Sequence, residues 1–221
     1  MKSFCIIGLG RYGTALAETL AAAGKEVLVI DTDEKNIADI ADRVDIAVQG
    51  DATQESVLRA AGVGGYDCAV VCMSENVNDS VLAVILLKEL GVGHIIARAG
   101  TERHAKVLEK LGVDEIVFPE TEYGTRMGRQ LSVDSVQEYF EFTEDTSIIE
   151  FEIPKTWAGK TLLELDIRKK YEVNVLTVRR PNSPKKGILA DPKAKFSEGD
   201  LVTVIGLNRD ISRLIERLRH N

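Results

Sequence analysis

Short runs of apolar, largely β-branched residues alternate with helical segments over the first part of the chain, up to about residue 133. The apolar runs are nearly continuous, which is typical of strands covered on both faces of a sheet. The helical segments between them mostly end at a glycine, as a left-handed C-terminal cap requires. The pattern predicts six strands, over residues 3–8, 26–31, 46–51, 68–74, 94–100 and 115–120.

Six strands with intervening helices predict an α/β fold with a Rossmann-like, doubly wound parallel sheet over residues 1–120. The character of the chain changes after residue 120. Residues 121–138 have helical runs that carry Gly124 and Gly128, and no further βα unit follows. We interpret 121–138 as a connecting, crossover helix and linker whose small residues permit close approach of another helix, such as one from a second copy of the chain. A frayed linker is the open alternative.

A small α+β C-terminal domain is predicted over residues 139–221. It is large enough to fold but small for a domain that encloses a substrate. Its predicted strands are 148–153, 173–178, 188–189 and 201–205, and its predicted helices are 161–169 and 210–219.

The composition of this 221-residue chain narrows the classes of partner. A formal net charge of −7 argues against general affinity for nucleic acid or for an anionic membrane surface. The first strand begins too early to leave room for a signal peptide, and the longest apolar run, 81–87, is too short to span a bilayer, so we expect a soluble, intracellular protein. Cys5, Cys68 and Cys72 lie in strand-like runs, which favours buried thiols over metal ligation by Cys68 and Cys72.

The first strand runs into a G-x-G-x-x-G loop that opens a helix, and the second strand ends in an acid, Asp31. In that context the pattern is a strong dinucleotide-binding fingerprint. Gly8 permits a tight turn, Gly10 lets the backbone approach a pyrophosphate, and Gly13 permits close packing of helix on sheet. Asp31 is placed to accept hydrogen bonds from ribose hydroxyls, which disfavours NADP relative to NAD or an adenine nucleotide. A Rossmann-like scaffold without a nucleotide is the alternative.

Further site candidates follow from topology, because ligands of open parallel sheets bind outside the carboxyl ends of the strands. Arg98 is placed to contact phosphate or ribose, or else to pair with a local carboxylate. Glu120 is placed to meet a phosphate-bound cation, or else to cap the following helix. The predicted nucleotide-binding residues are Gly8, Leu9, Gly10, Arg11, Tyr12, Gly13, Asp31, Thr32, Asp33, Asp51, Ala52, Thr53, Met73, Ser74, Glu75, Asn76 and Arg98.

The sequence displays no evident set of catalytic residues. A dehydrogenase needs a proton donor or acceptor beside the nicotinamide. His94 and His104 lie in the nucleotide domain, His104 as an expected surface residue, and His220 is next to the end of the chain. There is no nucleophile elbow, Walker lysine loop or zinc cluster. We therefore predict a nucleotide-binding protein that is not an enzyme; a small NAD-dependent oxidoreductase and a cytosolic ligand sensor unconnected to membranes are the alternatives.

Several segments together resemble the RCK (KTN) family of cytosolic regulators of potassium conductance, in its Ktr-type form with one nucleotide domain and a TrkA-C domain. The resemblance covers essentially the whole chain. It rests on "GLGRYG", "VID" ending at Asp31, "GDAT", "CMSEN", "IIARAG", "HAKVLEKLGVDEIVFPE" and the closing β-α-β-β-β-α unit.

The resemblance implies homodimers that assemble into octameric rings on the cytoplasmic face of an integral membrane potassium transporter or channel. It implies that ATP, ADP or NAD(H) changes the ring shape and gates the pore. By resemblance, Arg11 reaches the terminal phosphates and Glu120 lies at a metal site between subunits. Many relatives bind cyclic di-AMP at the C-terminal domain, where Arg168 matches a family position within a diverged segment. Asp33 stands where some ATP-binding relatives carry Asn, which leaves the nucleotide preference open.

Overall fold

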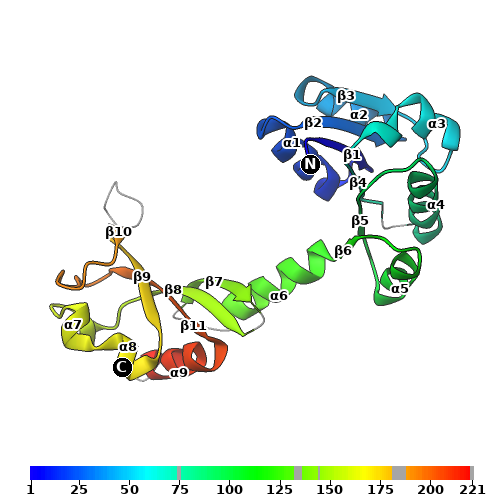
Figure 1. Ribbon diagram of the computed structural model, residues 1–221. Coiled ribbons are helices and arrows are strands. Elements are labelled where there is room, and N and C mark those ends of the chain that lie inside the picture. Colours follow the sequence, from blue (N-terminus) through cyan, green and yellow to red (C-terminus); the bar gives the residue numbers. More distant parts are fainter. Residues whose placement is uncertain (74–75, 132–135, 144, 181–187, 220–221) are drawn as a thin grey trace. The chain divides into compact units, whose positions relative to one another are not determined.

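The structure, a computed structural model, describes residues 1–73, 76–131, 136–143, 145–180 and 188–219. The chain divides into two compact units, Met1–Glu120 (unit 1) and Thr121–Asn221 (unit 2) (Figure 1). The strands of unit 1 are β1 (Ser3–Ile7), β2 (Glu26–Asp31), β3 (Ile46–Gln49), β4 (Cys68–Val71), β5 (Ile95–Arg98) and β6 (Glu115–Val117). Its helices are α1 (Arg11–Ala22), α2 (Glu34–Ile40), α3 (Glu55–Ala60), α4 (Val77–Glu89) and α5 (Glu102–Lys110).

Unit 1 is built on a six-stranded sheet in the order β3-β2-β1-β4-β5-β6. All neighbouring strands are parallel. The order reverses direction between β1 and β4, which makes the carboxyl ends of these two strands the topological switch point where doubly wound folds bind ligands. The predicted Rossmann-like α/β fold is confirmed.

Helices cover both faces of this sheet. On β1, the side chains of Cys5 and Ile7 pack into a core with residues of α3, α4 and α5, while Ile6 packs on the opposite face with residues of α1 and α2. Burial on both sides explains the near-continuous apolar character of the strands. The sheet is therefore a rigid platform for the loops at its carboxyl edge.

Unit 2 folds around an antiparallel sheet in the order β10-β9-β11-β8-β7. Its core contains Phe151, Trp157 and Val204 together with Leu214 of the last helix. The strands are β7 (Val136–Thr143), β8 (Thr146–Glu152), β9 (Asn174–Arg179), β10 (Ile188–Leu189) and β11 (Leu201–Leu207), and the helices are α6 (Pro119–Leu131), which begins at the end of unit 1, α7 (Leu162–Leu165), α8 (Ile167–Tyr171) and α9 (Asn208–Arg219).

Two details of unit 2 differ from the sequence prediction. The single helix predicted over 161–169 is two helices, because Asp166 adopts a left-handed conformation with φ of 44° and separates α7 from α8. A strand, β7, begins at Val136 inside the predicted linker 121–138, and it pairs antiparallel with β8. The predicted connecting helix is present as α6.

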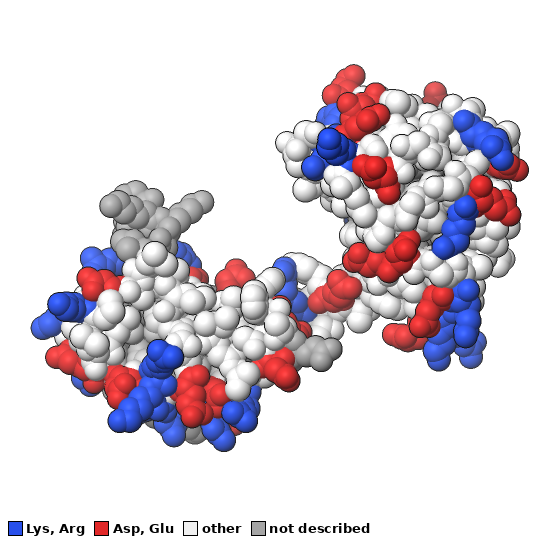
Figure 2. Space-filling view, viewed as in Figure 1, with Lys and Arg blue, Asp and Glu red and all other residues white. Residues whose placement is uncertain are grey.

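Acidic and basic side chains are interspersed over the surface that Figure 2 shows. Among the described helices, none combines the length and the apolar character that crossing a membrane requires.

Candidate functional site

The three glycines of the G-x-G-x-x-G segment, two in the loop between β1 and α1 and one in the first turn of α1, lie in three different environments. Gly8 has a φ of +93°, and a Cβ there would lie 3.0 Å from Cγ of Met73. A Cβ on Gly13 would lie 2.0 Å from the carbonyl oxygen of Gly8, so only glycine lets the helix approach the loop this closely. A Cβ on Gly10 would meet nothing within 4 Å. Gly8 and Gly13 are thus needed to shape the loop, whereas Gly10 faces open space.

The N-terminus of α1 has the properties of an anion site. Gly10 is its N-cap residue and supplies no side-chain cap, and the first turn of α1 carries no acidic residue. In α2 and α4, by contrast, Asp33 and Asn76 cap the helix with their side chains. The amides and the positive end of the α1 dipole are therefore open to an anionic group. Arg11, the first residue of α1, is exposed and adds a positive charge at the same place.

Asp31 ends β2 beside this loop and already orders it. One carboxylate oxygen accepts a hydrogen bond from the backbone N–H of Leu9, and the other accepts one from the N–H of Asp33 at 2.8 Å. The carboxylate retains further acceptor capacity, since an ionised carboxylate offers about four lone-pair sites. Asp31 is thus placed to hold the loop and also to accept from a ribose hydroxyl. Thr32 follows it and accepts at its carbonyl from the side chain of Gln49 at 3.3 Å.

After β3, Asp51 forms a compact turn with Thr53. The Asp51 carboxylate accepts from the Thr53 hydroxyl at 2.7 Å and from its backbone N–H at 2.9 Å. The hydroxyl bond and then the amide bond hold the pKa of Asp51 below its usual value. Ala52 between them is buried. The carboxylate is therefore committed to local structure, and it stays charged at neutral pH.

The end of β4 supplies the other wall of the switch point. Met73 contacts the position where Gly8 would carry a Cβ, so the β4 end touches the glycine loop directly. Tyr12 packs at the edge of the core on the α1 side of the sheet. Ser74 and Glu75 lie outside the described residues.

Arg98 at the end of β5 forms a link between two elements. Its guanidinium makes a two-pronged ion pair with Glu120 in the first turn of α6, with Nη2 to Oε1 at 2.5 Å and Nε to Oε2 at 3.3 Å. Nη1 also donates to the carbonyl of Cys72, directly before Met73, at 3.4 Å. Of the two alternatives for Arg98, the structure shows the pairing with a local carboxylate. In the described part of the chain, no group of three or more His, Cys, Asp or Glu side chains is arranged to hold a metal ion. The predicted metal residue, Glu120, thus supplies a single carboxylate, which is paired with Arg98.

His104 is not the surface residue that the sequence predicts. It is buried, since the amphipathic helix α5 turns this side inward, and its Nδ1 accepts from the N–H of Gly100 at 3.5 Å. Burial lowers the pKa of the imidazole. His104 is therefore a neutral core residue. The three cysteines are buried thiols as expected, and burial raises the pKa of Cys68 to about 11 and of Cys72 to about 12.

The structure thus brings the glycine loop, Asp31 and Met73 to one edge of the sheet, with Asp51 and Arg98 at the ends of neighbouring strands. Sequence reasoning missed the carbonyl of Cys72 as a partner of Arg98. No side-chain signal could have revealed it, because a backbone oxygen makes the contact.

This combination of a Rossmann-like domain with an open glycine loop and a small antiparallel domain defines a family. The model of the TrkA-N domain matches residues 4–119 and that of the TrkA-C domain matches residues 148–219. The chain belongs to the family of potassium uptake proteins that combine these two domains.

Within the family, the chain is similar to the subunits of Ktr systems. It is 38% identical over 221 residues to Ktr system potassium uptake protein C of Bacillus subtilis, covering 99% of this chain and 98% of that protein. It is 32% identical over 216 residues to Ktr system potassium uptake protein A of the same organism, covering 96% of this chain and 95% of that protein.

Solved structures share the fold over nearly the whole chain. The GsuK RCK domain aligns with a TM-score of 0.64 at 18% identity, covering 97% of this chain and 47% of that one. The GsuK channel bound to NAD aligns with a TM-score of 0.64 at 18% identity, covering 96% of this chain and 38% of that one. At this identity the likeness concerns the fold.

Proposed function

We propose that this protein is a nucleotide-sensing regulatory subunit that gates a potassium-translocating membrane protein. The ligand is ATP, ADP or NAD(H), bound at the glycine loop. The observation that carries the proposal is the open N-terminus of α1, where Gly10 leaves space for a ligand and exposed Arg11 adds charge. The family supplies the context, because its relatives are named potassium uptake proteins and one neighbour of the same fold is a channel bound to NAD.

The phosphates and the ribose of a nucleotide each have candidate partners at this edge of the sheet. The α1 amides receive phosphate, and Asp31 accepts from the ribose hydroxyls, while its charge repels a 2′-phosphate. Exposed Arg11, the first residue of α1, would meet the terminal phosphates, where ATP and ADP differ. We propose that Arg11 is the residue that senses how many phosphates the ligand carries.

Through Arg98, a structural change at the nucleotide site can reach α6. Its guanidinium bonds both to the Cys72 carbonyl, beside the wall of the nucleotide site, and to Glu120, in the first turn of α6. A ligand that shifts the β4 end, or that attracts Arg98 to its phosphate, changes the anchoring of α6. A nucleotide shifts such an equilibrium only by its differential affinity for the two arrangements.

We also propose that the protein acts as a homodimer within an octameric ring. The exposed side of α6 supports a contact with a second copy, because Tyr123 and Leu131 are 55% and 73% exposed and Met127 lies between them at helical spacing. Gly124 and Gly128 allow close approach of the second helix. The ring would sit on the cytoplasmic face of the membrane, against an integral potassium transporter or channel subunit.

Two further ligands belong to the proposal. A cation bound with the nucleotide would use Glu120, released from Arg98, together with phosphate oxygens and a carboxylate from a second copy. Cyclic di-AMP would bind unit 2 near Arg168, in the last turn of α8. Both are expectations by family resemblance.

Calorimetric titration of the purified protein with ATP, ADP and NADH tests the proposal. We expect at least one of them to bind, and we expect Arg11→Ala to weaken ATP binding about tenfold more than ADP binding, the value of one charge-assisted hydrogen bond. Arg59→Ala is the matched control, because Arg59 is exposed on α3 and pairs with Glu55 one turn earlier in the same helix. Failure of all three ligands to bind would contradict the proposal, and equal loss for ATP and ADP would make Arg11 a general phosphate contact.

The membrane role has its own test. We expect the protein to co-purify with an integral potassium transporter, and potassium flux through that transporter in vesicles to respond to nucleotide with the wild-type chain but not with Gly10→Ala. Turnover of an alcohol or acid with NAD, abolished by the same substitution, would instead identify an oxidoreductase.

A further inference from the structure

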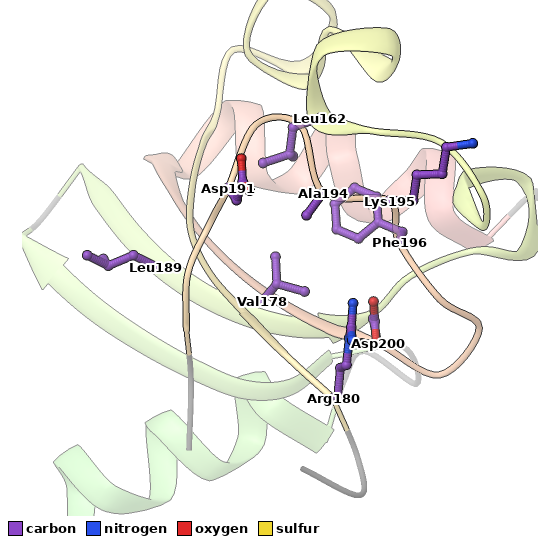
Figure 3. Close-up of a pocket in the computed structure, with 9 residues that line it drawn as sticks. All are labelled: Leu162, Val178, Arg180, Leu189, Asp191, Ala194, Lys195, Phe196 and Asp200. Carbon is purple, nitrogen blue, oxygen red and sulfur yellow. Dashed lines mark ion pairs between the residues drawn. The ribbon is translucent and has the colours of Figure 1, made fainter. Parts of the chain in front are cut away.

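Unit 2 contains a cavity of about 160 Å³ (Figure 3). Its lining residues all come from unit 2, whereas the predicted nucleotide site lies in unit 1. The lining residues come from the start of α7, from β9 and β10, and from the segment that leads into β11. An apolar cavity of about 150 Å³ holds one benzene molecule. The space thus fits a body of about one ring.

Most of the cavity wall is apolar. Leu162, Val178 and Ala194 surround the space, and the Phe196 ring closes one side. Phe196 is itself held, because its N–H donates to the carbonyl of Lys160 at 2.9 Å and its ring packs against the Trp157 ring with centroids 6.1 Å apart. A preformed apolar wall of this kind binds a ligand without a large ordering cost.

One polar atom in the cavity wall, a carboxylate oxygen of Asp200, is buried without a hydrogen bond from the described residues. Asp200 lines the cavity and its side chain is only 2% exposed. Its Oδ2 accepts from the N–H of Ser197 at 2.8 Å, whereas its buried Oδ1 has no hydrogen-bond partner among the described residues. Among the described residues, Nε of Arg180 pairs with Oδ1 at 4.0 Å, and it belongs to a side chain that is 60% exposed. That distance is an ion pair and too long for a hydrogen bond.

The charged residues around the cavity, taken together, favour neither a positive nor a negative ligand. Arg180 and Lys195 bring two positive charges to the cavity, and Asp191 and Asp200 bring two negative ones. Asp191 and Lys195 are exposed at the rim, so water satisfies them. The buried acceptor on Asp200 is therefore the group that a ligand must match; it calls for a hydrogen-bond donor, and a carboxylate binds a charged donor more strongly than a neutral one.

We propose that this cavity is a binding site for a small amine whose apolar body, of about one ring or one branched chain, fills the space while its ammonium group donates to Oδ1 of Asp200. The inference is independent of the proposed nucleotide function, since all its residues lie in unit 2. It is also separate from the position expected to contact cyclic di-AMP, because Arg168 does not line the cavity.

Three probes that share one ring test the proposal: benzylamine, benzyl alcohol and benzoate, titrated into the full-length protein at pH 7 with NMR detection. We expect benzylamine to bind about tenfold more tightly than benzyl alcohol, because a hydrogen bond to a charged donor and acceptor is about that much stronger than one from a neutral donor. Benzoate should bind weakest. Equal affinity for all three, preference for benzoate, or no binding at millimolar concentration would overturn the proposal.

Variants locate the site. Asp200→Asn keeps an oxygen and removes the charge, so it should abolish the preference for benzylamine over benzyl alcohol. Ala194→Trp approaches from the opposite wall at an exposed position whose side chain points toward the cavity, and it should reduce binding of every probe even if the Asp200 variant does not fold (Figure 3). Glu216→Gln, at an exposed position of α9 that does not line the cavity, is the matched control and should leave the preference unchanged. Retention of the preference in folded Asp200→Asn, or undiminished binding in Ala194→Trp, would contradict the assignment.

Discussion

Two alanine substitutions in one loop should have opposite consequences. Gly10→Ala places a methyl group where the protein has nothing within 4 Å, whereas Gly13→Ala places one 2.0 Å from the carbonyl oxygen of Gly8. Gly10 also has an ordinary φ of −66°, so alanine adopts its conformation without strain. The first substitution should therefore remove nucleotide binding from an intact fold, and the second should damage the fold itself.

The expected magnitudes follow from these contacts. For Gly10→Ala, a poorer helix cap costs about 0.5–1 kcal/mol and the stiffer unfolded chain returns about 0.4–1 kcal/mol, so the free energy of unfolding should hardly change. The added methyl group displaces phosphate from one or two backbone amides, each worth about 1.5–3 kcal/mol, which weakens binding at least about tenfold. For Gly13→Ala, no side-chain movement relieves a contact with backbone, so the cost should reach about 3 kcal/mol.

Calorimetric titration with ATP, ADP and NADH, and thermal unfolding followed by circular dichroism, separate the two effects. Gly10→Ala should unfold within a few degrees of the wild type, and Gly13→Ala about 10 °C lower. Unchanged nucleotide affinity in Gly10→Ala would refute the assignment of the loop as a phosphate site. An unchanged unfolding temperature in Gly13→Ala would refute the argument from close packing.

Three further predictions follow. Thr53→Val removes the hydroxyl hydrogen bond that lowers the pKa of Asp51. A lowered pKa stabilises the folded state above the ordinary value of 3.8, and this stabilisation is lost as the pH falls through the folded pKa. The variant should therefore unfold at a lower temperature than the wild type at pH 7, and this difference should shrink at pH about 3. Met127→Asp places a charge on the exposed apolar side of α6 and should shift the mass measured by light scattering from dimer or ring toward monomer, while a monomeric wild type would remove the basis for this expectation. Arg98→Ala should leave Glu120 free and strengthen binding of Mg²⁺ together with ATP, as measured by titration; weaker Mg²⁺ binding would argue that Arg98 orients Glu120 instead of competing for it.

The fold of unit 1 was predictable because its sheet is buried on both faces. Continuous apolar runs such as the one ending at Val71 have no other stable environment in a chain of this size. The strand β7 was not predictable in the same way, because Phe140 and Phe142 are 52% and 60% exposed on either side of Glu141 on a surface strand. Its pattern matches a helix end almost as well, and pairing with β8 decides the conformation.

In the candidate site too, some features follow from the local sequence and others depend on how distant elements pack together. Gly8, Gly13 and Asp31 were identified because each meets a local backbone requirement that the sequence displays. The burial of His104 was missed because it depends on which face of α5 meets the sheet, and a polar residue in a helix with many charges gives no sign of that. Pairing of Arg98 with Glu120 joins residues 22 positions apart, and it depends on the neighbouring positions of β5 and β6.

The burial of Cys5, Cys68 and Cys72 has a practical consequence for studies of this protein. A thiol reacts as the thiolate, and desolvation raises the pKa of all three far above neutrality. Toward maleimides and spin-label reagents, the folded chain should therefore behave as if it had no cysteine. One new cysteine on an exposed residue of unit 1 and another on unit 2 would accept a pair of probes without removal of native residues. The distance between such probes, with and without nucleotide, would show whether nucleotide binding moves the two units relative to one another.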